Sequence, residues 1–153
     1  QRVTMHPATR FIATMNQGYA GTRDLNEALA SRFVVILMPD IASDALVRLL
    51  RNETPELKVS FAGDLARVFV DIQKKTANSE ISSRLLDLRG LLDSVQLMKM
   101  GIEPWIALDM GITNKSSDEF ERSLLQDIIR GRIPQGLTVD AIFERNSSVP
   151  QNA

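Results

Sequence analysis

Three polar residues occupy positions where their side chains could act on a phosphate-bearing ligand. Asn16 follows the apolar run 10–15, Arg32 directly precedes the apolar run 33–38, and Arg84 follows a group of N-cap residues at 78–83. An amide at the carboxyl edge of a parallel sheet can orient a water or a phosphate oxygen. A guanidinium at the entrance of a strand can be offered to a neighbouring molecule. A cation in the first turn of a helix opposes the helix dipole unless an anion shares the site.

Each of these residues also has an ordinary structural explanation. Asparagine before Gln-Gly is a common turn starter, and arginines ahead of strands are mostly solvated. Arg84 could extend away from the helix terminus or pair with Glu80 or Asp87. On residue type and position alone, both interpretations stay open.

Composition excludes several classes of chemistry. The 153 residues include no cysteine and a single histidine, His6, which excludes disulfides, thiolate nucleophiles, iron–sulfur clusters and multi-histidine metal sites. No Ser-containing nucleophile elbow accompanies His6, so a hydrolase triad is not indicated. No Gly-rich phosphate loop ending in Gly-Lys-[Ser/Thr] occurs in the chain. We therefore expect no metal ligands here.

Charge and hydropathy bear on the partners. The formal net charge is -1, which provides no basic field to attract nucleic acid or anionic lipid. The longest apolar run, 33–38, is far shorter than the roughly 20 residues that cross a bilayer. No basic leader with an apolar core starts the chain. We expect no nucleic-acid partner, no membrane insertion and a cytoplasmic location.

The first forty residues read as strand, loop, helix, strand. The runs 10–15 and 33–38 are apolar without alternation, which is typical of strands covered on both faces. Residues 24–30 lie between them and read as a short helix with acidic residues in its first turn. Two such strands need neighbours that this stretch does not supply, so the α/β part looks incomplete.

The sequence after residue 39 is predicted to be helical. Spacings of three and four residues between apolar side chains indicate amphipathic helices, and a capping box is expected at 116–119. The residues 138–143 are ambiguous between helix and strand, and the polar tail from 145 is expected to fray. The predicted helical segments are 45–51, one with the stripe Leu65, Val68, Phe69 and Ile72, one with the stripe Leu85, Leu88, Leu92 and Val95, 105–110, and 120–129.

The stretch from His6 to Phe33 resembles the MoxR-like and dynein-related AAA+ ATPases, a group that includes midasin. Its Asn16 ends the first apolar run, Gly-Tyr-Ala-Gly follows at 18–21, and Ser-Arg-Phe stands at 31–33. The tetrapeptide 81–84, Ile-Ser-Ser-Arg, resembles the sensor 2 motif of the family's lid. The resemblance implies a mostly α fold with two strands and a short helix from the end of the α/β core. In this interpretation residues 1–40 are that core, 41–145 the all-helical lid, and 146–153 a disordered tail.

The same resemblance implies a role for each residue. Asn16 would be sensor 1, which positions the attacking water, and Arg32 would be the arginine finger that reaches the nucleotide of a neighbouring subunit. Arg84 would be sensor 2, acting in cis or in trans. The implied partners are the subunits of a homo-oligomeric ring and a protein substrate that is remodelled or matured. Gln17 departs from the proline that many relatives carry.

The resemblance also implies what is missing. The Walker A loop and Walker B strand of the family precede sensor 1, and this sequence starts after both. ATP and Mg²⁺ are therefore expected in the intact parent ATPase, whereas these residues alone should neither bind ATP tightly nor hydrolyse it. Unpaired strands also predict self-association or rearrangement of the N-terminal part.

Without the resemblance, the residues can be compared with two other functions. The amphipathic helices could form a non-enzymatic protein-interaction module. A helix-turn-helix DNA-binding domain fits poorly, because the net charge is -1 and no predicted helix carries a strongly basic face.

Overall fold

The computed structural model describes residues 4–15 and 26–144. Within these ranges the chain is mostly helical and forms no β-strand, which confirms the predicted mostly α fold class. The chain divides into two compact units, one ending at Ile36 and the other beginning at Leu37. The assignment of residues 1–40 to an AAA+ core stays a prediction.

The described part of the first unit contains one regular element, helix α1 (Glu27–Ala30). It begins where the Asn26 side chain accepts a hydrogen bond of 2.9 Å from the backbone N–H of Ala28, the usual role of asparagine at an N-cap. A helix was expected over 24–30. The structure forms it over 27–30, and residues 24 and 25 lie outside the described ranges.

The two predicted strands are not formed. Residues 10–15 and 33–38 have irregular backbone, and Ile12 and Val34 are 93% and 92% exposed. An apolar run becomes a strand only when a neighbouring strand pairs with its backbone and other elements cover its faces. No described segment of this unit does either. The prediction was wrong because it took composition as sufficient for a structure that depends on pairing.

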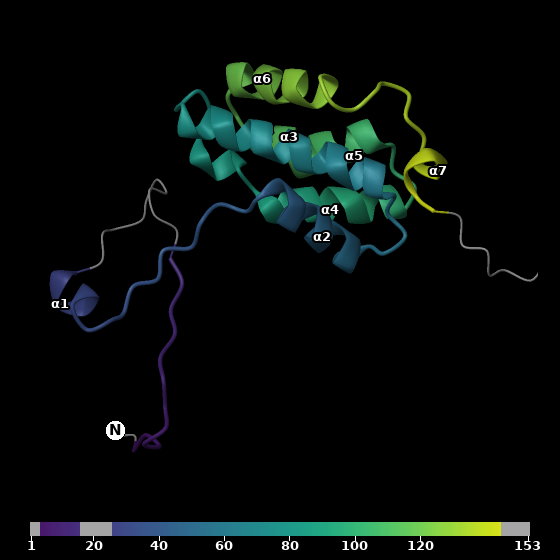
Figure 1. The fold of residues 1–153 in the computed structure, drawn as a ribbon. Coiled ribbons are helices and arrows are strands. Elements are labelled where there is room, and N and C mark those ends of the chain that lie inside the picture. The colour runs from purple at the N-terminus through teal and green to yellow at the C-terminus, as the bar shows by residue number, and fades with distance from the viewer. Residues whose placement is uncertain (1–3, 16–25, 145–153) are drawn as a thin grey trace, which may run out of the picture. The chain divides into compact units, whose positions relative to one another are not determined.

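The second unit is a helical bundle. Figure 1 shows α3 through its middle, with α6 along one side and α2 and α4 along the other. Two short 3₁₀ turns, η1 and η2, join successive helices. The elements are α2 (Ser43–Glu53), α3 (Val59–Ala77), η1 (Ser83–Leu85), α4 (Leu88–Lys99), α5 (Pro104–Gly111), η2 (Thr113–Lys115), α6 (Glu119–Arg130) and α7 (Val139–Ile142).

The predicted stripe of α3 forms the centre of the core. Leu65, Val68, Phe69 and Ile72 are all at least 96% buried, as expected for apolar residues that recur on one face of a helix. The helix predicted over 120–129 is also formed, as α6. Leu125 and Ile129 of α6 are buried against this core, so the bundle closes around α3.

The stripe predicted around α4 is displaced. Asp87 is the N-cap residue and the helix begins only at Leu88, so Leu85 belongs to the separate turn η1 and is buried there. Within α4 the buried face includes Leu91 and Val95, while Leu88 and Leu92 are partly buried. The leucine spacing continues from η1 into α4 although the helix is interrupted between them. Apolar spacing alone does not reveal such an interruption.

The last described residues close the bundle onto the α2–α3 loop. Phe143 and Leu57 form an isolated antiparallel bridge, and the backbone N–H of Lys58 donates to the carbonyl of Ile142 at 2.9 Å. The ambiguous residues 138–143 therefore contain both a short helix and one extended residue. The predicted tail 146–153 lies outside the described ranges.

Candidate functional site

The first unit contains Arg32, whereas Asn16 lies outside the described residues. Arg32 is exposed and stands two positions beyond the end of α1. Its guanidinium donates a hydrogen bond to the carbonyl oxygen of Ala28, one of the carbonyls that a helix leaves without a partner at its carboxyl end. Arg32 thus acts as a helix cap in this structure, a role that the sequence reasoning missed.

Arg84 belongs to the second unit and lies in η1, four residues before α4. It was expected in the first turn of the long helix, but Asp87 caps that helix instead. The argument from the helix dipole therefore does not apply to Arg84. Its side chain is 51% exposed, and its nearest carboxylate is that of Glu121, at 3.8 Å between Nη2 and Oε2.

The two carboxylates proposed as structural partners of Arg84 are engaged elsewhere. Glu80 accepts a hydrogen bond of 2.7 Å from Lys75, and Asp87 pairs with Lys115 of η2. Both carboxylates are held by lysines, and the guanidinium of Arg84 lies nearest to Glu121 of α6. No sequence pattern indicates this helix as the neighbour of Arg84.

Glu121 joins three segments of the bundle. Its Oε1 accepts a hydrogen bond of 2.8 Å from the backbone N–H of Ser82, and its Oε2 accepts one of 2.5 Å from the hydroxyl of Ser116. The backbone N–H of Glu121 in turn donates to Asp118, the N-cap residue of α6. Sequence reasoning missed Glu121. The spacing Asp118-x-x-Glu121, which is that of a capping box, was the signal that could have singled it out.

The neighbouring ion pair between Asp87 and Lys115 ties α4 to η2. Burial raises the pKa of Asp87, but the Lys115 ammonium and the backbone N–H groups of Gly90 and Arg89 outweigh burial, so the pKa of this carboxyl is lower than usual. Asp87 is therefore a carboxylate near neutral pH. The turn that carries Arg84 is thus flanked by two carboxylates, those of Asp87 and Glu121, and the Arg84 side chain is half exposed.

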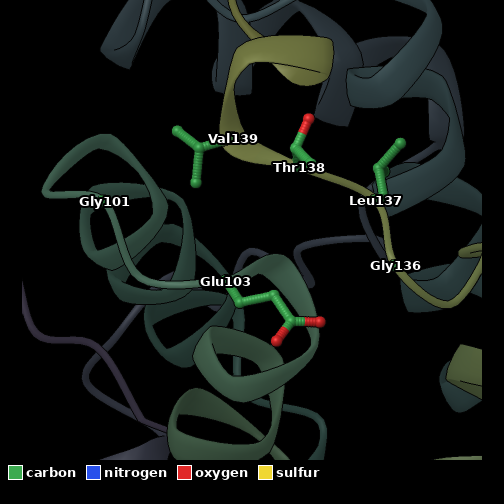
Figure 2. Close-up of a pocket in the computed structure, with 6 residues that line it drawn as sticks. All are labelled: Gly101, Glu103, Gly136, Leu137, Thr138 and Val139. Atoms are coloured by element: carbon green, nitrogen blue, oxygen red, sulfur yellow. The ribbon is translucent and has the colours of Figure 1, made fainter.

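An open cavity of about 380 Å³ lies elsewhere on the bundle, between the α4–α5 loop and the segment that enters α7. Figure 2 shows the Glu103 carboxylate across from Thr138 and Val139. Neither Arg32 nor Arg84 lines this cavity. Its lining residues are Gly101, Glu103, Gly136, Leu137, Thr138 and Val139.

In residues 4–15 and 26–144, no group of three or more acidic or histidine side chains could hold a metal ion. No helix in the described part of the chain is both long and apolar enough to cross a membrane.

The chain is similar to uncharacterized proteins of Bacillus and Staphylococcus. Uncharacterized protein YojN of Bacillus subtilis is 31% identical over 117 residues, which make up 76% of this chain and 38% of that protein. An uncharacterized protein of Staphylococcus haemolyticus is 30% identical over 124 residues, or 80% of this chain and 46% of that protein. The chain thus spans less than half the length of these curated relatives. No family model matches the chain, and no solved structure matches it.

Proposed function

We propose that the chain is the sensor and lid portion of a ring-forming, MoxR-like AAA+ ATPase. Such a machine couples ATP hydrolysis to the remodelling or maturation of partner proteins. The observation that carries the proposal is the order of Asn16, Arg32 and Arg84 along the chain, in the motif contexts described above. Asn16 would position the attacking water, Arg32 would reach a neighbouring subunit's nucleotide, and Arg84 would report nucleotide state to the lid.

The second unit supports the proposal by its construction. Residues 43–144 bury a core of their own, as a lid that moves as one body requires. Arg84 lies at the surface of this bundle with its side chain half exposed, so a nucleotide could reach the guanidinium without unfolding the bundle. A buried arginine at this position would have argued against the role.

The two apolar runs support the proposal because neither is paired as a strand in the described structure. Residues 33–38 are wholly apolar, yet Val34, Ile36 and Met38 are at least 77% exposed. Such a run is suited to an inner strand of a parallel sheet. The curated relatives are more than twice as long as the stretch they share with this chain, which leaves room for a core that supplies that sheet, the phosphate loop and the Mg²⁺ ligands.

The test uses the full-length protein that contains this chain. Arg32→Ala should lower steady-state ATP hydrolysis by about 10³-fold or more, with little change in nucleotide affinity, because an arginine finger acts on the transition state. Arg48→Ala is the matched control, since Arg48 is a well-exposed arginine whose ion-pair partner, Asp44, is on its own helix. An absence of ATP hydrolysis in the full-length protein, or full activity of Arg32→Ala, would refute the proposal.

Mixed rings test whether Arg32 acts across an interface. Asn16→Ala and Arg32→Ala subunits should each be inactive alone. When they are mixed, some interfaces combine an intact Asn16 with an intact Arg32 from the neighbour, so roughly a quarter of the wild-type activity should return. No recovery on mixing would place both residues in the same site of one subunit.

A second role, a non-enzymatic protein-interaction module, is favoured by exposed apolar side chains on the bundle. Met100 and Phe120 are 79% and 71% exposed. This role predicts that the chain binds its partner equally well with and without the remainder of the full-length protein and regardless of ATP. A partner retained only by the longer, ATP-bound protein would favour the ATPase.

A further inference from the structure

We infer that Glu121 is the positioning residue for Arg84: it holds the turn that carries Arg84 against the start of α6. The inference rests on the proposed role of Arg84. It concerns a contact between residues far apart in the chain, because Ser82 and Glu121 are separated by 39 positions.

The hydrogen bond from Ser82 to Glu121 fixes the backbone N–H of Ser82, which has no partner within its own turn. Ser82 precedes η1, and its carbonyl closes the turn by accepting from the N–H of Leu85 at 3.0 Å. Its N–H points outward and donates to Glu121 Oε1 at 2.8 Å. A hydrogen bond from a backbone amide to a carboxylate is among the stronger kinds. The N-cap residue of the turn, Ser82, is thereby tied to Glu121 of α6.

Two buried side chains fix the turn at its ends. Ile81 and Leu85 are 4% and 2% exposed and belong to the core. Arg84 lies between them on the solvent side. The backbone that carries Arg84 is therefore held by two apolar anchors and one polar anchor, and only the polar one lies near the guanidinium.

The side chain of Glu121 is held independently of Arg84. Its second oxygen accepts from the Ser116 hydroxyl at 2.5 Å, and the side chain is 14% exposed. Arg84 approaches the same oxygen only to 3.8 Å, longer than a hydrogen bond. An ion pair of this length whose guanidinium is half exposed is weak. Arg84 can thus exchange this carboxylate for a phosphate while Glu121 continues to hold the turn.

The decisive comparison is a double-mutant cycle in the full-length protein. Glu121→Ala should lower kcat/KM for ATP about tenfold, and adding Arg84→Ala should cause no further loss beyond that of Arg84→Ala alone, because residues that act through one another are not additive. Losses that multiply would show that Glu121 serves stability only, and would overturn the inference. Glu119→Ala, an exposed acidic residue in the same first turn, is the control and should leave kcat/KM unchanged.

The conservative variant separates hydrogen bonding from charge. Glu121→Gln keeps an oxygen that accepts from the Ser82 N–H and an amide that can donate to the Ser116 hydroxyl. If Glu121 acts by anchoring the turn, this variant should restore kcat/KM to within about twofold of wild type, since the polar anchor remains. A Glu121→Gln variant as impaired as Glu121→Ala would overturn the anchoring mechanism.

A structural readout keeps this inference separate from the proposed function. In the chain itself, Glu121→Ala should speed hydrogen exchange of the Ser82 amide about tenfold or more, while the amide of Val68 in α3 exchanges as before. Unchanged exchange at Ser82 would overturn the inference whatever the enzymatic result. Faster exchange at Ser82 in a protein without ATPase activity would refute the proposed function and leave the anchoring contact established.

Discussion

Gly90 of α4 and Gly111 of α5 bring their two helices together at a distance that leaves no room for a side chain at either position. A Cβ atom on Gly90 would collide with the carbonyl oxygen of Gly111, and one on Gly111 would collide with the Ser94 hydroxyl and the carbonyl of Gly90. The Ser94 hydroxyl donates to the Gly90 carbonyl at 2.8 Å in this crossing. Both glycines are buried, so the contact belongs to the core of the bundle.

The crossing predicts that Gly90→Ala destabilises the bundle. Because the atom in the way is backbone, the helices must separate, and overpacking of this kind costs about 1–3 kcal/mol. Urea denaturation followed by circular dichroism measures the loss. Gly63→Ala in α3 is the control: its Cβ would meet only the end of the Arg67 side chain at 3.9 Å, so it should stabilise by roughly 0.5–1 kcal/mol. A Gly90→Ala variant as stable as wild type would contradict the close approach.

Acid should destabilise the second unit through its ion-paired carboxylates. The pKa of Asp87 is lowered despite burial, chiefly by Lys115, and the pKa of Glu56 is lowered by its hydrogen bond from Lys99. A carboxyl whose pKa is lower in the folded state adds stability above its unfolded pKa of about 4, and that stability is lost as the pH falls through the folded pKa. The free energy of unfolding should therefore be steady above about pH 5 and decline below about pH 4.

Lys115→Gln isolates the contribution of Asp87 to this decline. Without the ammonium, the burial of Asp87 is no longer outweighed by its main partner, so the folded-state pKa of Asp87 rises toward or above its unfolded value. Asp87 then no longer adds to the acid decline, and the decline below about pH 4 should become shallower. Urea denaturation from about pH 3 to about pH 7 measures it. Lys74→Gln, at a lysine whose side chain is 71% exposed, should leave the profile unchanged. Identical profiles for wild type and Lys115→Gln would show that the pair is not formed.

The apolar run 33–38 should be buried in the full-length protein and exposed in the chain alone. Val34 is 92% exposed in the chain, so Val34→Ala should leave its unfolding free energy within about 0.5 kcal/mol of wild type. In the full-length protein the same change should cost about 1–3 kcal/mol, because it would remove methyl groups from the proposed sheet. An equal, small effect in both would remove the support that this run lends to an AAA+ core.

The same exposed runs predict self-association of the chain alone. Apolar segments that lack their strand partners tend to pair with other copies. Analytical ultracentrifugation at rising concentration should show dimers or larger species, and Ile36→Lys should reduce them because a charge placed on the run opposes pairing. A chain that stays monomeric throughout would contradict this prediction. The second unit provides the control: Val59→Lys, at an exposed position of α3, should not change the association.

The helices were predictable because their signal is local. Leu65, Val68, Phe69 and Ile72 lie on one face of a helix because they are spaced three and four positions apart. The runs 10–15 and 33–38 misled the prediction for the opposite reason. A strand forms only with a partner strand, which can lie anywhere in the sequence. The composition of an apolar run does not show whether that partner is present.

By itself the sequence determined the helical class of the chain after residue 39 and the order of Asn16, Arg32 and Arg84 on which the proposed function depends. Only the tertiary structure decided that Arg84 faces Glu121 and that α4 and α5 meet at Gly90 and Gly111. The physical reason is the separation in sequence between the residues that interact. Helix formation depends on side chains three and four positions apart, whereas an ion pair or a helix crossing joins residues that become neighbours only after the chain has packed.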